Sequence, residues 1–121
     1  MFFKKTLYPL LFFIVVTILL QSCDNANDNI LSGTITYVDS ISGLEVYANE
    51  AFIGLYKDQN LTEPLDSMYS DSEGEYLFYP VNYGSYYLYS ELSLNSTSYT
   101  DTVSVNVNMN STKTQNLILK H

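Results

Sequence analysis

Hydrophobic and polar residues alternate with a period of two along most of the chain after residue 29, and turn-forming residues interrupt this alternation every eight to twelve positions. Such alternation is typical of strands that bury one face, and the regular turn spacing is typical of an all-β sandwich or barrel. No segment of useful length has the spacing of a helix. The sequence therefore predicts an all-β fold of seven or eight strands. The expected strands span residues 31–38, 44–47, 51–57, 65–70, 75–79, 85–92, 99–108 and 112–120.

Two short connections suggest hairpins. The turn at residues 80–84 would make the strands on either side of it adjacent and antiparallel, and the turn at residues 109–111 would form a closing hairpin from the last two strands. The strand at 65–70 follows a polar loop and has weak alternation. We expect it at the edge of a sheet.

Two glycines fix the phase of the alternation in the middle of the chain. Gly74 and Gly84 stand at successive corners, where a positive φ costs other residues more than glycine. With these corners placed, alternate residues fall on opposite faces of the following strands. The face expected in the core holds Tyr76, Phe78, Tyr86 and Leu88, and the opposite face holds Leu77, Tyr79, Tyr87 and Tyr89.

The N-terminal segment has the layout of a secretory signal, which must be excluded from the fold. Lys4 and Lys5 precede an apolar run from Leu7 to Leu20. This run is too short for a comfortable membrane span, which needs roughly 20 apolar residues. Cys23, the only cysteine of the chain, follows directly and has no second cysteine with which to form an internal disulfide.

Residues 19–23 (Leu-Leu-Gln-Ser-Cys) resemble the lipobox of bacterial lipoprotein signals, with Gln21 as a departure from the usual residue. The resemblance implies that Cys23 becomes the lipidated first residue of the mature protein, with fatty-acyl chains such as palmitate. The expected organisation is a signal peptide at 1–22, a lipidated tether at 23–29 and a β-sandwich at 30–121. An ordinary secretory signal and an uncleaved anchor helix are the alternatives.

Charge limits the partners of the mature chain. After residue 22 only three lysines remain against 13 acidic residues, a net charge of about −10, and the chain has no arginine. Nucleic-acid binding depends on lysine and arginine contacts to phosphates, so we exclude it. Anionic headgroups would repel the chain, so membrane attachment has to come from the lipid on Cys23.

Several strand motifs resemble the carboxypeptidase regulatory-like domain, a transthyretin-like β-sandwich common in exported bacterial proteins. The resemblance covers about residues 31–92 and implies an accessory, non-catalytic domain. Residues 47–50 stand where the family has proline and glycine. The motifs are Gly33-x-Ile35, Ala51-x-Ile53-x-Leu55, Asp71-x-Glu73-Gly74-x-Tyr76-x-Phe78 and Gly84-x-Tyr86-x-Leu88.

Tyr79, Tyr87 and Tyr89 are the candidate ligand platform. If their strands are adjacent, the three rings share an outward face that could stack on sugars or anchor a protein. The alternative is that these tyrosines only stabilise the sheet, because tyrosine has a high β-propensity and cross-strand aromatic pairs are stabilising. Tyrosine also occurs in the other expected strands, and we favour this second explanation.

The sequence offers weaker indications of a metal site or a catalytic site. Asp71, Glu73 and Glu75 are candidate calcium ligands, since calcium takes six to eight oxygen ligands, although an acidic turn of this kind is usually a plain hairpin corner. His121, the only histidine, is the final residue of the sequence. Neither a zinc site nor a Cys–His pair can be assembled, so we expect no enzyme and no cofactor.

The sequence therefore predicts a non-catalytic, lipid-anchored protein in the envelope of a Gram-negative bacterium, at the outer membrane, that acts as a binding or structural module. One alternative is an accessory subunit of an outer-membrane uptake or secretion complex, in which an edge strand pairs with a partner. Another is a glycan-binding module that uses outward tyrosines.

Overall fold

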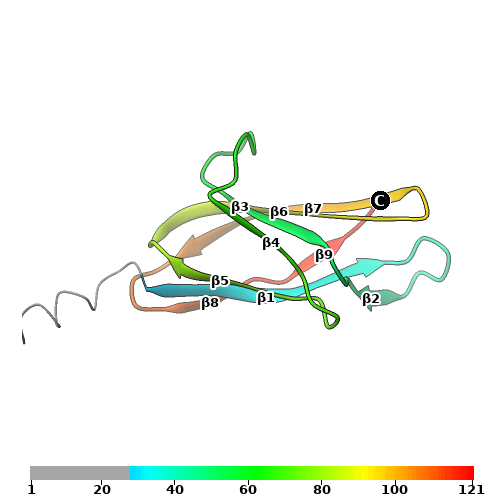
Figure 1. Cartoon of the computed structure of the whole chain (residues 1–121), viewed down its shortest axis with the longest axis horizontal. Helices are drawn as coiled ribbons and strands as arrows, with labels where there is room; N and C mark the ends of the chain where they lie inside the picture. Colours follow the sequence, from blue (N-terminus) through cyan, green and yellow to red (C-terminus); the bar gives the residue numbers. More distant parts are fainter. Residues whose placement is uncertain (1–27) are drawn as a thin grey trace, which may run out of the picture.

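The computed structural model describes residues 28–121, and the expected signal peptide and Cys23 lie outside these residues. Two β-sheets pack face to face in two layers (Figure 1). The predicted all-β sandwich is confirmed, with nine strands in residues 28–121 rather than seven or eight. They are β1 (Asn29–Val38), β2 (Glu45–Tyr47), β3 (Phe52–Tyr56), β4 (Asp66–Tyr69), β5 (Glu75–Val81), β6 (Gly84–Leu94), β7 (Thr97–Val107), β8 (Thr112–Thr114) and β9 (Leu117–Leu119).

Strand β1 is the centre of the five-stranded sheet. Its first half pairs antiparallel with β5 and parallel with β8, and its second half pairs antiparallel with β2 and parallel with β9. The other sheet has the order β4-β3-β6-β7, with all neighbours antiparallel. Strand β4 is therefore an edge strand, as expected for the weak segment at residues 65–70.

Both predicted hairpins are wrong. Strand β5 pairs with β1, whereas β6 pairs with β3 and β7, so the chain changes sheets between β5 and β6. The segment after β7 likewise changes sheets and runs parallel to β1 as β8 and β9. Alternation shows which face of a strand is buried, but both sheets of a sandwich bury one face, so the pattern cannot show which strands are neighbours.

The core fills the space between the sheets. The face predicted to be buried is buried, since Tyr76, Phe78, Tyr86 and Leu88 expose between 0% and 5% of their surface. Each large apolar side chain that is fully buried stabilises the fold by about 1.5–3 kcal/mol relative to an exposed one. The largest apolar side chains in this class are Phe78, Leu31, Ile35, Ile53, Leu88, Leu117 and Leu119.

The predicted corner glycines have positive φ, 73° at Gly74 and 149° at Gly84. Gly74 also lies against β1, because a Cβ on it would be 2.2 Å from the backbone oxygen of Ile35. In residues 47–50, where the resemblance in sequence would place proline and glycine, Glu50 takes a positive φ of 57°. Glycine adopts this left-handed backbone most easily, so Glu50 takes it at a cost.

Residues 115–116, which we call the Gln115 junction, separate β8 from β9. The Gln115 backbone N–H donates to the Ser32 carbonyl at 2.9 Å, and the Tyr76 hydroxyl donates to the Gln115 carbonyl. The Asn116 Oδ1 accepts from the Thr34 backbone N–H at 2.9 Å. A Cβ on Gly33 would lie 2.0 Å from the Gln115 carbonyl oxygen, so only glycine allows this close approach.

Candidate functional site: an aromatic face on the four-stranded sheet

The three tyrosines of the predicted platform do not share a face. Tyr79 lies on β5 and points outward from the five-stranded sheet, whereas Tyr87 and Tyr89 lie on β6 and point outward from the other sheet. The prediction of a single platform assumed that β5 and β6 are neighbours, and this assumption is wrong. Tyr79 is therefore separated from the other two rings by the thickness of the sandwich.

Tyr87 and Tyr89 instead have other aromatic neighbours. The register places Tyr87 opposite Tyr56 and Tyr89 opposite Gly54, so the side chains of β3 and β6 share an outward face. Further along the same side, Phe52 is opposite Tyr69, with ring centroids 6.0 Å apart in an edge-to-face arrangement. The aromatic face consists of Phe52, Tyr56, Tyr69, Tyr87 and Tyr89.

Gly54 lets one of these rings lie across the sheet. A Cβ at this position would be 2.7 Å from Cε1, 2.9 Å from Oη and 3.0 Å from Cζ of Tyr56. The Tyr56 ring therefore occupies the space where a side chain of residue 54 would stand, and Tyr56 is only 6% exposed although it lies on the outward side. Glycine in a strand interior is destabilising, and it often marks a place where another group approaches closely.

The loop after β3 borders the aromatic face and stands out from the sandwich (Figure 1). The Asp58 carboxylate holds this loop, because its Oδ2 accepts from the Thr62 hydroxyl at 2.8 Å. This hydrogen bond lowers the pKa of Asp58 from its ordinary value, so the side chain remains ionised at neutral pH. The loop ends where the Leu65 backbone N–H donates to the Leu55 carbonyl at 2.7 Å.

Glu91 introduces a carboxylate beside the rings. Burial raises the pKa of Tyr89, and the charge and hydrogen bond of Glu91 raise it further, so the Tyr89 hydroxyl keeps its proton. The Ser98 hydroxyl donates to Glu91 Oε1 at 3.3 Å. On the adjacent β7, the outward positions opposite these residues carry exposed hydroxyl groups. They are Thr100 opposite Glu91, Thr102 opposite Tyr89 and Ser104 opposite Tyr87.

This arrangement is suited to binding a sugar chain. Aromatic rings present a rigid apolar surface with polar edges, on which the C–H face of a pyranose can stack. The carboxylate and the row of hydroxyl groups can donate to and accept from sugar hydroxyls. His121 lies away from these rings and packs edge-to-face on Tyr99, with centroids 5.6 Å apart.

Sequence reasoning identified Tyr87 and Tyr89 but missed Phe52, Gly54, Tyr56 and Tyr69. A signal for them was present, because residues 52, 54 and 56 alternate as aromatic, glycine and aromatic on the face opposite to Ile53 and Leu55. Its importance depends on the pairing of β3 with β6, which the sequence does not reveal.

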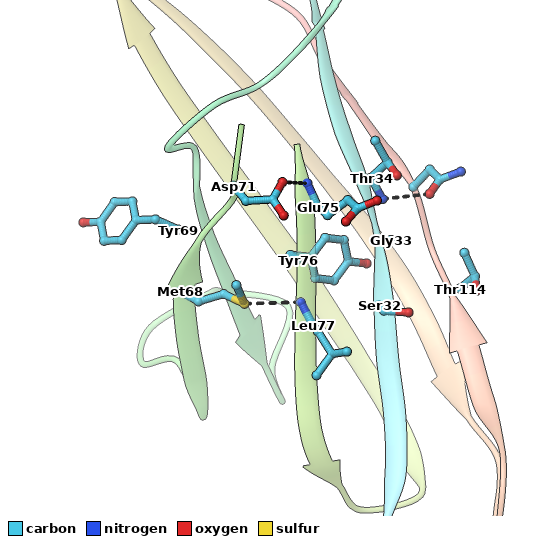
Figure 2. Close-up of a pocket in the computed structure, with 11 residues that line it drawn as sticks. Ser32, Gly33, Thr34, Met68, Tyr69, Asp71, Glu75, Tyr76, Leu77 and Thr114 are labelled. Atoms are coloured by element: carbon cyan, nitrogen blue, oxygen red, sulfur yellow. Dashed lines mark hydrogen bonds between the residues drawn. The ribbon is translucent and has the colours of Figure 1, made fainter. Parts of the chain in front are cut away.

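A second surface is a groove of about 510 Å³ that is lined by residues of β1, β4, β5 and β8 (Figure 2). Met68 reaches across from β4, and its Sδ accepts from the Leu77 backbone N–H at 3.3 Å. The Asp71 Oδ1 accepts from the Glu75 backbone N–H at 2.9 Å. Side chains therefore accept from two backbone N–H groups at the β5 edge, and one of these acceptors is a weakly accepting thioether sulfur.

The predicted acidic turn is organised as a hairpin corner. The Asp71 Oδ1 accepts from the backbone N–H groups of both Glu73 and Glu75, each at 2.9 Å. Within residues 28–121, no three acidic, histidine or cysteine side chains are placed to hold a metal ion together. The weak calcium candidates Asp71, Glu73 and Glu75 are thus not brought together as ligands.

No family model matches the chain, and no curated protein matches its sequence. Solved structures with a similar fold include the following two. One is a proposed carbohydrate-binding protein from Pseudomonas aeruginosa, with a TM-score of 0.51 and 18% identity over 79% of this chain and 90% of that protein. The other is the minor pilin of the Gram-positive pathogen Streptococcus agalactiae, with a TM-score of 0.56 and 16% identity over 75% of this chain.

The chain spans 43% of that pilin. At these identities both likenesses show the fold alone, which is a β-sandwich. The resemblance to the carboxypeptidase regulatory-like domain stays a prediction. In the part of the chain that the structure describes, there is no helix long and apolar enough to cross a membrane.

Proposed function

We propose that this protein is a non-catalytic glycan-binding module that is displayed at the envelope of a Gram-negative bacterium, at the outer membrane, by lipid on Cys23. The observation that carries the proposal is the aromatic face, where four strands place five aromatic side chains, a carboxylate and a row of hydroxyl groups on one side of a sheet. The likeness to a proposed carbohydrate-binding protein agrees with this function.

Packing alone explains part of the aromatic face but not all of it. Tyr56 is buried and Phe52 is half-buried, as expected for residues that stabilise a sheet. Tyr69, however, remains 65% exposed, and Tyr87 and Tyr89 are half-buried although both are at outward positions. Exposed aromatic surface with polar groups on its border is typical of a binding site.

Removing the two β6 rings tests the binding function. Full-length protein in nonionic detergent would be incubated with insoluble cellulose, chitin, xylan and mannan, and the bound fraction measured. We expect retention on at least one of them. The double variant Tyr87→Ala/Tyr89→Ala should bind about tenfold more weakly, which corresponds to roughly 1.4 kcal/mol.

Tyr79→Ala is the matched control, because it removes an exposed tyrosine from the other sheet. It should bind like the wild type. The double variant should also keep most of its stability, since cross-strand pairs contribute only about 0.2–1 kcal/mol each. Retention on none of the four polysaccharides, or equal retention of the double variant, would contradict the function.

Lipid attachment has a separate test. Intact-mass measurement of protein extracted from envelopes should find an N-terminal Cys23 that carries acyl chains, because stable anchoring needs two lipid signals or more. The variant Cys23→Ser should leave the membrane fraction. An unmodified thiol at Cys23 in the wild-type protein would refute the anchor but leave the glycan site intact.

An accessory subunit of an outer-membrane uptake or secretion complex is the second candidate. The observation that favours it is the Leu77 backbone N–H, whose acceptor is a thioether sulfur, a weak acceptor that a strand carbonyl could replace. Leu77 and Tyr79 next to it are more than half exposed. Substitutions at the β5 edge, and not on the aromatic face, would then weaken partner binding.

A further inference from the structure

The charges around the aromatic face restrict the kind of glycan that it can take. Among the outward positions of β3, β4, β6 and β7, Glu91 is the single charged residue. It lies next to Tyr89, with which it is hydrogen-bonded. A ligand stacked on the β6 tyrosines therefore meets a negative charge and no positive one at these positions.

The lysines of residues 28–121 lie outside the outward positions of these four strands. Lys57 Nζ lies 4.5 Å from the centroid of the Tyr86 ring, whose side chain faces the core. Lys113 belongs to β8 in the other sheet. Lys120 lies at the outer edge of β7, where its backbone pairs with Thr100, and Thr100 in turn lies opposite Glu91 of β6.

The border of the face on the other side is acidic. The loop from β3 to β4 carries Asp58 and Glu63, and Asp66 begins β4. The side chain of Asp58 is exposed, and its hydrogen bond to Thr62 lowers its pKa from the ordinary value. Negative charge on Glu91 and on this border disfavours a ligand of the same sign, since like charges brought together at an interface oppose binding.

From this distribution we infer that the aromatic face binds uncharged polysaccharide and rejects anionic polysaccharide, and that Glu91 makes the discrimination. The inference rests on the proposed glycan-binding function and names the class of its ligand. An uncharged sugar ring is not repelled by Glu91, and the carboxylate can accept hydrogen bonds from its hydroxyl groups. A uronate, sulfate or phosphate group at the same place would be repelled.

The test compares each neutral polysaccharide with its negatively charged derivative. Soluble glucan, xylan and mannan would each be paired with its carboxymethylated form, and binding of the full-length protein would be measured by affinity electrophoresis in nonionic detergent. We expect the wild type to bind the neutral member of at least one pair about tenfold more tightly than the charged member, a difference of about 1.4 kcal/mol. High salt should reduce this difference, because it screens exposed charges.

Glu91→Gln is the decisive variant, since it removes the charge and keeps the shape and an acceptor oxygen for Tyr89. It should reduce the ratio of the affinities for the neutral and charged polymers to below about threefold, whatever its effect on the affinity for the neutral polymer alone. An equal affinity of the wild type for both members of a pair, or an unchanged ratio in Glu91→Gln, would overturn the inference and leave the glycan-binding function standing. Absence of binding to every polymer would refute both.

Discussion

Substitution of Gly33 by alanine is expected to lower the free energy of unfolding by about 3 kcal/mol, the upper end of the usual range for overpacking. The added Cβ would lie 2.0 Å from the carbonyl oxygen and 2.7 Å from the carbonyl carbon of Gln115. Both are backbone atoms, so relief of the clash must move the Gln115 junction away from β1. Denaturant unfolding of the purified protein measures the loss.

Gly54→Ala is the control, because it also adds a methyl group to a glycine inside a strand. The three heavy atoms nearest to its Cβ would be distal ring atoms of Tyr56, which can move by rotation of the side chain. Alanine also removes the entropic cost of glycine, about 0.5–1 kcal/mol. We expect a change in stability of less than about 1 kcal/mol. A smaller loss for Gly33→Ala than for Gly54→Ala would show that the Gln115 junction is not the rigid contact described above.

Tyr76→Phe should lower the free energy of unfolding by about 1–3 kcal/mol at neutral pH, because it leaves the Gln115 carbonyl without its hydroxyl donor. The ring itself stays and continues to pack against Phe78, with centroids 5.8 Å apart. The loss of stability therefore measures the contribution of the hydroxyl group and not that of core packing. A loss below about 0.5 kcal/mol would indicate that water or another group satisfies this carbonyl.

The same residue should make the fold sensitive to alkaline pH. Burial raises the pKa of Tyr76 above its ordinary value of 10, so the folded protein holds this proton more tightly than the unfolded chain does. The contribution is complete below pH 10 and is lost as the pH rises above that value. Unfolding curves at pH 8 and at pH values above 10 should show a fall in stability that is smaller in Tyr76→Phe.

The variant Tyr76→Phe should still lose some stability at alkaline pH, because burial also raises the pKa of Tyr86 and Tyr89. Equal pH dependence in the variant and the wild type would mean that Tyr76 does not titrate differently in the folded and unfolded states.

Much of the local structure could be predicted from the sequence. Alternation and two glycines were enough to assign Phe78 and Leu88 to the core, because a strand's faces follow from its own residues. Strand pairing could not be predicted in the same way. A turn of a few residues can close a hairpin or carry the chain to the opposite sheet, and the alternation on either side of it is the same in both cases.

The hairpin that does form in this region shows the difference. Asn95 and Ser96 join β6 to β7, and both have positive φ, 51° and 67°, as a two-residue turn between antiparallel strands requires. Prediction of the candidate site likewise required knowledge of which strands pair. Tyr87 and Tyr89 were visible as outward residues, but their neighbours Gly54 and Tyr56 come from a strand more than thirty positions earlier in the chain.

The parallel pairing of β1 with β8 and β9 also has a consequence for how the protein folds. The hydrogen bond from Thr34 to Asn116 joins residues that are 82 positions apart, and β1 otherwise pairs with strands from the first two-thirds of the chain. Proteins dominated by such sequence-distant contacts fold slowly, on the order of milliseconds to seconds. A nascent chain that has not yet produced residue 119 cannot complete the sheet around β1, so assembly of this sheet has to wait for the synthesis of β9.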